Sequence, residues 1–117
     1  PEQVIQQYQQ IVGRPYLPAY WAFGYQFCRY GFKGLTDLKD TIGRIQNAQI
    51  PIDVMYADID YMDRYKDFTT GQKEWGDFPA YTEQKHKEGL KLTLIFDPAI
   101  EVDYEPFSRG LDKVGVL

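Results

Sequence analysis

The sequence predicts an α/β fold in which a short helix is followed by three parallel strands that alternate with two helices. Apolar residues recur at helical spacing in two segments and at strand spacing in two others, and glycine and proline residues mark the boundaries of the elements. Successive strands joined by a single helix form right-handed crossovers and lie parallel in one sheet. The 117 residues fall well short of the ~250 residues of an eight-stranded barrel. A small open sheet and the first three strands of a barrel therefore both fit this pattern.

The first two helices are predicted from apolar stripes. Residues Pro1–Val12 carry apolar side chains at helical spacing, and Gly13 follows directly as a natural stop. A second helix is expected to begin at residues 34–36 and to end before Pro51, with Thr36 as its N-cap residue. The stripe on this second helix consists of Leu35, Leu38, Ile42 and Ile45.

The third helix is predicted from near Pro79 to His86 or Lys87. Proline is favoured in the first turn of a helix, and Gly89 suits the position just beyond its end. His86, the one histidine of the chain, lies at the far end of this helix and is expected at the surface. Residues 63–77 contain two glycines and no regular pattern, so this segment is expected to be a loop.

Strands are predicted over Trp21–Arg29, Ile52–Asp58 and Leu90–Phe96. The first alternates large aromatic side chains with small or polar ones, which indicates one face packed against helices and one face toward a tight interior. The second strand does not separate its two faces cleanly. The third places three leucines on one face and Ile95 on the smaller, inner face.

The composition narrows the classes of function. The net charge is −4 and no basic stripe is present, so nucleic acid is not an expected partner. The single cysteine, Cys28, allows no internal disulfide. No apolar run approaches the ~18 residues needed to span a bilayer. Aromatic residues make up 16% of the chain, and those outside the core can form a platform on which a sugar ring stacks.

Polar and aromatic residues gather where each predicted strand ends. The first strand ends in residues 28–32 (CRYGF), the second in residues 58–61 (DIDY) and the third in residues 97–99 (DPA). In parallel α/β proteins the carboxyl ends of the strands form the active-site edge. The sequence therefore predicts a functional rim at this edge, centred on Asp58.

The pair Asp58 and Asp60 is compatible with three roles. Two carboxylates can bind a hard cation, as in a metal-dependent glycosyltransferase, but no third ligand is evident in the sequence. The two carboxyls of a retaining glycosidase lie on opposite sides of the scissile bond, whereas neighbours on one strand approach it from one side. In the third role, which we favour, Asp58 accepts charge-assisted hydrogen bonds from two substrate hydroxyls, and Asp60 caps a loop.

Most of the chain resembles glycoside hydrolase family 31, and in particular its α-glucosidases. The resemblance rests on GRPYLPAYWAFGYQFCRYGF (13–32), AQIPIDVMYADIDYMDRYKDFT (48–69), LKLTLIFDPAI (90–100) and EPFSRG (105–110). It implies that residues 1–117 are the amino-terminal part of a (β/α)8 TIM barrel: the first three β/α units of an incomplete domain, preceded by a short helix. It also implies retaining hydrolysis of terminal α-linked glucose from oligosaccharides.

The resemblance assigns substrate-binding roles to four residues. Asp58, which opens the D-I-D-Y motif, would bind hydroxyls of the terminal glucose, and the following Ile59 would line the pocket. Tyr30 in the C-R-Y-G motif would form another wall of this pocket. Ile95, two positions before the D-P of the third strand, would be a further pocket residue, in agreement with its predicted inner face.

The resemblance implies that no catalytic residue lies within these 117 residues. The nucleophile of the family is an aspartate in a Trp-x-Asp-Met-Asn-Glu motif, which does not occur here, and the acid/base aspartate comes later in the chain. Residues 75–78 (WGDF) do not match the motif. The chain alone is therefore expected to be inactive, and two open sheet edges would make it poorly soluble.

Further expectations follow from the same resemblance. No metal or cofactor is expected, the substrate is an α-glucoside oligosaccharide, and the partner is the remainder of the same barrel chain. The location is expected to be secreted, lysosomal or membrane-anchored extracellular. The alternative is a non-catalytic barrel-type carbohydrate-binding or scaffold domain, which the presence of the nucleophile motif further along the chain would exclude.

Overall fold

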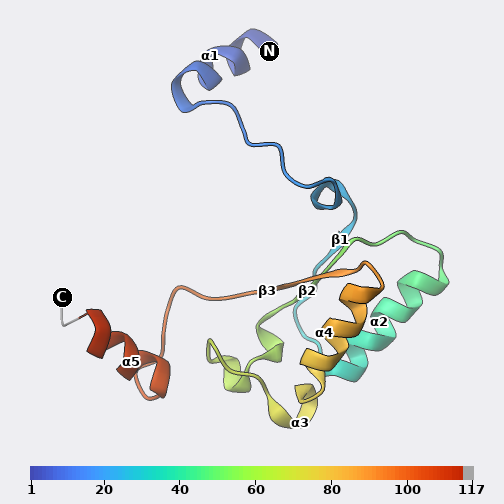
Figure 1. The fold of residues 1–117 in the computed structure, drawn as a ribbon, viewed down its shortest axis with the longest axis vertical. Helices are drawn as coiled ribbons and strands as arrows, with labels where there is room; N and C mark the ends of the chain where they lie inside the picture. Colours follow the sequence, from blue (N-terminus) through green and yellow to red (C-terminus); the bar gives the residue numbers. More distant parts are fainter. Residues whose placement is uncertain (115–117) are drawn as a thin grey trace.

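The computed structural model describes residues 1–114 and contains a three-stranded parallel sheet (Figure 1). The strands are β1 (Gln26–Phe27), β2 (Val54–Ala57) and β3 (Lys91–Leu94), in the order β1-β2-β3. The central strand β2 pairs in parallel with both neighbours. The predicted parallel sheet and the predicted order of strands and helices are thus confirmed.

Two helices pack on one face of the sheet. Helix α2 (Leu35–Asn47) connects β1 to β2, and α4 (Phe78–Lys87) leads into β3. They lie side by side, with Lys39 Nζ of α2 5.1 Å from the centroid of the Tyr81 ring of α4 (Figure 1). Burial of one large apolar side chain contributes about 1.5–3 kcal/mol to stability. The core that this packing buries consists of Phe32, Leu35, Leu38, Ile42, Met55, Ala57, Tyr61, Met62, Trp75, Phe78, Tyr81 and Leu90.

The opposite face of the sheet carries mainly polar side chains. The strand register places Val54 beside Gln26 and Lys91, and it places Tyr56 beside Thr93. The Tyr56 hydroxyl donates a hydrogen bond to Gln26 Oε1 at 2.8 Å, which joins β1 to β2 on this face. Because side chains alternate along a strand, positions 28, 58 and 95 continue this face beyond the paired residues.

The first predicted strand is wrong over most of its length. Residues Tyr20–Phe23 form a 3-10 helix, η1, and only Gln26–Phe27 pair in the sheet. The amide of Gly24 ends η1 by donating to the carbonyl of Trp21 at 3.1 Å. A Cβ atom at Gly24 would lie 1.8 Å from Asp53 Oδ2, so the Gly24 backbone lies against the side chain of the residue that precedes β2. This contact joins segments that are distant in sequence, so the alternation of residues along the first predicted strand does not reveal it.

The start of α2 also differs from the prediction. Gly34 occupies the N-cap position, and Thr36 lies inside the helix. Gly34 has φ +145° and packs against α3 (Gln72–Trp75), where an added Cβ atom would lie 3.0 Å from Glu74 Cβ. Glycine alone adopts this backbone conformation at low cost, so Gly34 rather than Thr36 sets the start of the helix.

The predicted loop over residues 63–77 contains short helical turns. A 3-10 turn, η3 (Asp63–Tyr65), and α3 lie within this segment. Another 3-10 turn, η2 (Ile59–Tyr61), precedes it and begins after Asp58, the residue that follows β2. Trp75 at the end of α3 is 3% exposed and meets the Phe78 ring edge-on at a centroid distance of 5.4 Å. Core packing of Trp75 therefore stabilises a helix that is too short to show a periodic pattern in the sequence.

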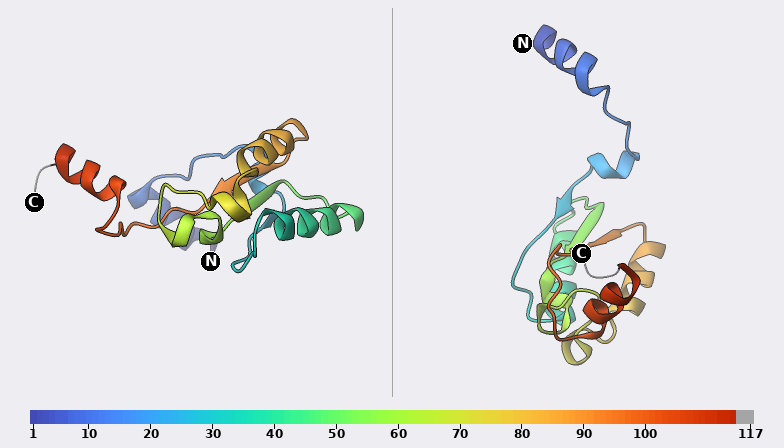
Figure 2. Two further views of the ribbon diagram at one scale, coloured as in Figure 1. Left: turned by 90° about the horizontal axis from the view of Figure 1, so that it is seen from below. Right: turned by 90° about the vertical axis from the view of Figure 1, so that its left-hand side faces the viewer.

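Two further helices lie away from the sheet. Helix α1 (Glu2–Val12) is confirmed and has no buried residue, whereas α5 (Glu105–Val114) is absent from the sequence-based prediction. Both stand at the ends of extended segments in Figures 1 and 2. The radius of gyration is accordingly 18.8 Å, compared with about 13 Å for a compact domain of 100 residues. Within residues 1–114, no helix has the length and apolar character required to cross a membrane.

Candidate functional site

The carboxyl ends of the three strands meet at one edge of the sheet, and Asp58 lies there directly after β2. Its Oδ1 atom accepts a hydrogen bond from the Ile59 amide at 2.8 Å, which caps η2. Its Oδ2 atom lies 3.9 Å from Cys28 Sγ at the end of β1. Partial burial, followed by the charge of Asp58, raises the pKa of the Cys28 thiol. The predicted rim thus brings residues of the first two strands into contact.

Ile95 joins this rim from the third strand. Its amide donates to the carbonyl of Ala57 at 3.2 Å, which extends the pairing of β3 with β2 by one step. Its carbonyl accepts a hydrogen bond from the Tyr61 hydroxyl at 2.9 Å. These two contacts place Ile95 beside the end of β2, where Asp58 begins the next segment.

Asp60 has a different environment from Asp58. Its Oδ2 atom accepts a hydrogen bond from the Gly31 amide at 2.8 Å, so its carboxylate connects the loop after β2 to the loop after β1. This contact agrees with the predicted structural role of Asp60. The two aspartates, although only two positions apart, therefore have separate partners in the described part of the chain.

Arg29 fixes the loop after β1 at its base. The guanidinium group donates to Asp37 Oδ2 in α2 at 2.9 Å and lies 4.0 Å from the centroid of the Phe32 ring. The Lys33 amide donates to the same carboxylate oxygen at 3.2 Å. Since these contacts hold both ends of the loop, Tyr30 forms its outward-facing tip.

Tyr30 and Ile59 occupy different surroundings at the rim. The side chain of Tyr30 is 60% exposed. Hydrogen bonding to the Tyr65 hydroxyl is the largest cause that raises the pKa of Tyr30, and the charges of Asp60 and Asp58 add to the shift. Ile59, in contrast, packs partly buried against the hydrophobic core. The structure therefore gathers Tyr30, Asp58 and Ile95 at the rim, whereas Ile59 also contributes to the core.

Asp67 is one further residue of the rim, and no sequence pattern indicated it. Its side chain is 3% exposed, and both carboxylate oxygens accept the amide hydrogen of Asp97, at 3.0 and 3.1 Å. Its carbonyl accepts a hydrogen bond from the Tyr104 hydroxyl at 3.1 Å. Asp67 thus holds the chain just after β3. A single aspartate in a loop without periodicity carries no sequence signal for this role.

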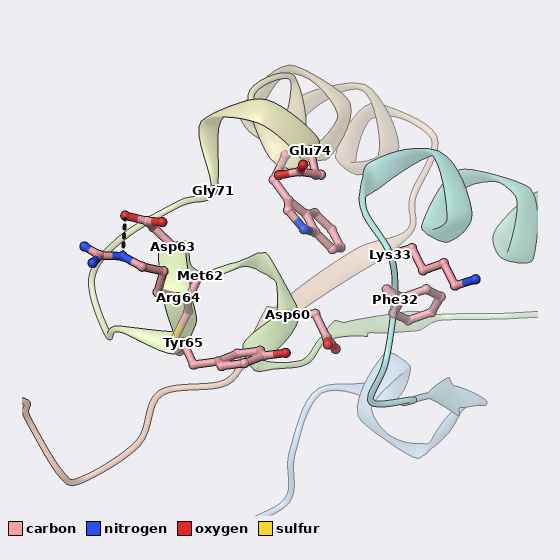
Figure 3. A pocket seen from close by; sticks show the side chains of 10 residues that line it. Phe32, Lys33, Asp60, Met62, Asp63, Arg64, Tyr65, Gly71 and Glu74 are labelled. Atoms are coloured by element: carbon pink, nitrogen blue, oxygen red, sulfur yellow. Dashed lines mark ion pairs between the residues drawn. The ribbon is translucent and has the colours of Figure 1, made fainter.

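A cavity of about 320 Å³ opens beside Asp60 (Figure 3). In Figure 3 the ring of Tyr65 lies on the same side of this cavity as Asp60, with its hydroxyl toward the carboxylate. The lining combines charged and aromatic side chains from three segments: Phe32, Lys33, Asp60, Met62, Asp63, Arg64, Tyr65, Gly71, Glu74 and Trp75. Asp58 is not part of this lining, so the cavity lies next to the Asp58 rim rather than within it.

The arrangement is suited to binding hydroxyl groups. Over residues 1–114, no three histidine, cysteine or acidic side chains gather in a group that could hold a metal ion. A carboxylate offers about four acceptor positions, and that of Asp58 makes one short hydrogen bond to a backbone amide. Donors from a neutral polyhydroxylated ligand can therefore reach its remaining positions.

Comparisons with known proteins agree with this geometry. Residues 15–117 match the family described as the glycosyl hydrolases family 31 TIM-barrel domain. The chain is 42% identical over 120 residues to probable maltase-glucoamylase 2 of Homo sapiens, covering 100% of this chain and 5% of that protein. It is 37% identical over 118 residues to lysosomal alpha-glucosidase of Bos taurus, covering 97% of this chain and 13% of that protein.

A solved structure gives the same result. The crystal structure of the glucosidase II alpha subunit, in a form described as bound to Glc1Man2, aligns with a TM-score of 0.71 at 30% sequence identity. The alignment covers 79% of this chain and 10% of that chain. The chain thus spans a small share of each of these proteins. Because the family match extends over nearly all of its residues, the chain belongs to the glycosyl hydrolases of family 31, as a part of their TIM-barrel domain.

Proposed function

We propose that this chain forms one side of the glucose-binding pocket of a retaining α-glucosidase, with Asp58 as the residue that binds the hydroxyls of the terminal glucose. The environment of the Asp58 carboxylate is the main support. Its Oδ1 accepts one backbone hydrogen bond, and its Oδ2 faces the weakly donating thiol of Cys28 at 3.9 Å. Hydrogen bonds from hydroxyls to a carboxylate are roughly twice as strong as those between neutral groups.

Three other residues would complete this side of the pocket. Ile95 lies beside the end of β2 because its amide donates a hydrogen bond to the Ala57 carbonyl, and the Tyr30 side chain faces outward from the neighbouring loop. An isoleucine and an aromatic ring suit the apolar C–H surface of a sugar. Ile59 would line the pocket from the start of η2 while its side chain packs on the core.

The substrate would be an α-glucoside oligosaccharide cleaved at its terminal glucose. The names of the relatives, which include a maltase-glucoamylase and an alpha-glucosidase, support this substrate class. A secreted, lysosomal or membrane-anchored extracellular location is proposed on the same basis, since one relative is described as lysosomal.

The reaction would be a double displacement, in which two carboxyl groups lie ~5–5.5 Å apart on opposite sides of the scissile bond. Asp58 and Asp60 do not suit these two roles, because both follow β2 and Asp60 binds the Gly31 amide. The nucleophile and the proton donor would therefore come from the remainder of the same barrel chain, which is the partner that this chain needs.

The test is the substitution Asp58→Ala in the complete parent enzyme. Removing two hydrogen bonds to a charged acceptor, at ~1.5–3 kcal/mol each, lowers kcat/KM by roughly 10²–10⁴-fold. A mechanism-based glucoside reagent should still label the nucleophile, but more slowly. The control is Asp63→Ala in the same loop, which removes an exposed carboxylate and should change kcat/KM by no more than about twofold. An unchanged kcat/KM in the Asp58→Ala enzyme would show that Asp58 does not bind the substrate.

A further inference from the structure

The hydrogen bond between Asp60 and Gly31 lies beyond the end of the paired strands. The pairing of β1 with β2 ends at Phe27 and Met55, four residues before Gly31. Gly31 has φ +92°, so the chain turns here in a conformation that regular strand pairing does not support. The 2.8 Å contact from the Gly31 amide to Asp60 Oδ2 therefore holds a turn that lies outside the sheet.

This turn directly follows Tyr30. The Tyr30 side chain is 60% exposed, so core packing does not fix its ring. Its backbone is held on one side by Arg29, which is bound to Asp37, and on the other side by Gly31, which is bound to Asp60. The chain is thus held on both sides of Tyr30, and on the Gly31 side the carboxylate of Asp60 holds it.

Tyr65 lines the cavity beside Asp60, and in Figure 3 its hydroxyl points toward the Asp60 carboxylate. Tyr65 itself has φ +60° and follows Arg64 at φ +52°, a left-handed conformation that costs about 1 kcal/mol or more for each non-glycine residue. The Thr69 hydroxyl accepts the Asp63 amide at 2.9 Å and bonds the Lys66 carbonyl, which closes the loop around this strained pair.

We propose that Asp60 is a positioning residue that holds Tyr30 as a wall of the substrate pocket, because its carboxylate binds the turn that directly follows Tyr30. This inference rests on the proposed glucose-binding role of the rim. It gives Asp60 a function beyond the loop cap that its sequence context indicates.

The first test compares Asp60→Ala with Asp60→Asn in the complete parent enzyme. Asparagine keeps a carbonyl oxygen that can accept the Gly31 amide, whereas alanine does not. We expect Asp60→Ala to raise KM for a disaccharide about tenfold, the effect of losing one such hydrogen bond, with a smaller change in kcat. Asp60→Asn should retain a KM within about threefold of the wild type. Equal losses in both variants would overturn the proposal.

The second test is Asp63→Ala, a matched control in the same loop, whose exposed carboxylate lies 3.7 Å from Arg64. Its KM should stay within about twofold of the wild type. A rise in KM equal to that of Asp60→Ala would overturn the proposal.

The Asp58→Ala enzyme separates this inference from the proposed function. A loss of kcat/KM in Asp58→Ala together with an unchanged KM in Asp60→Ala would refute only the positioning role. An unchanged kcat/KM in Asp58→Ala would refute the glucose-binding role itself.

Discussion

The buried carboxylate of Asp67 accepts the amide hydrogen of Asp97 with both of its oxygens, at 3.0 and 3.1 Å, across 30 positions of sequence. Asp67 lies in the loop after β2, and Asp97 lies just beyond β3. The contact therefore connects the second and third strand ends, in the same way that Asp60 connects the first and second. Two aspartates thus hold together the edge at which Asp58 lies.

We expect Asp67→Ala to destabilise the carboxyl end of β3. The substitution leaves the Asp97 amide without its acceptor, at a cost of ~1–3 kcal/mol. The neighbouring Ile95 should shift as a result, so KM should rise together with the loss of stability. Asp67→Asn keeps one acceptor oxygen, so its loss of stability and its rise in KM should both be smaller. The measurements are the thermal midpoint and KM of the complete enzyme, and equal effects of the two substitutions would contradict this account.

Two glycines at α2 should respond in opposite ways to alanine. Gly34→Ala should destabilise the protein by ~1–3 kcal/mol, because φ is +145° and the new Cβ would lie 3.0 Å from Glu74 Cβ. Gly43→Ala, inside the same helix with no atom within 4 Å of the new Cβ, should stabilise it by ~0.5–1 kcal/mol. The thermal midpoints of the two variants measure this difference. A gain in stability on Gly34→Ala would show that the described start of α2 is wrong.

Removal of the Tyr81 hydroxyl should stabilise the protein. The hydroxyl is buried and has no hydrogen-bond partner among the described residues, and leaving such a group unpaired costs ~1–3 kcal/mol. Tyr81→Phe removes this group while the ring keeps its place beside Lys39 and Lys85. We expect a higher thermal midpoint at neutral pH. A lower midpoint would indicate that the hydroxyl has a partner in the complete enzyme.

The same hydroxyl should make stability depend on alkaline pH. Burial, followed by the charge of Glu88, raises the pKa of Tyr81 to about 12, whereas an unfolded tyrosine titrates near ~10. Between these values the unfolded state binds fewer protons than the folded state, so stability falls as pH rises. Tyr81→Phe lacks this contribution. The thermal midpoint of Tyr81→Phe should therefore exceed that of the wild type by a growing margin between pH ~10 and ~12.

Alkylation of Cys28 should report on Asp58 without any sugar present. The raised pKa of Cys28, caused first by burial and then by Asp58, means that the reactive thiolate forms only at a pH above its ordinary range. Asp58→Asn removes the negative charge and should move the pH profile of iodoacetamide labelling to lower pH. Cys28→Ser identifies the labelled site. An unmoved profile in Asp58→Asn would show that the two side chains are not neighbours.

The sequence by itself determined the order of the three strands and of the two helices between them, but not the extent of the first strand. The stripe of α2, the inner-face position of Ile95 and the cluster around Asp58 could all be predicted, because each depends on periodicity or on neighbours along the chain. The family resemblance added the prediction of a TIM barrel, because three parallel strands alone also fit a small open sheet. The roles of Asp58, Tyr30, Ile59 and Ile95 in substrate binding remain predictions for the experiments above.

The tertiary structure decided which residues contact one another across segments that are distant in sequence. It shortened the first strand where Gly24 meets Asp53, placed the start of α2 at Gly34 beside Glu74, and buried Asp67 against the Asp97 amide. It also separated the roles of Asp58 and Asp60, because only Asp60 reaches the Gly31 amide. Such contacts join residues 29 to 40 positions apart, and the distance between those residues is fixed by packing of the sheet and its helices rather than by any local pattern.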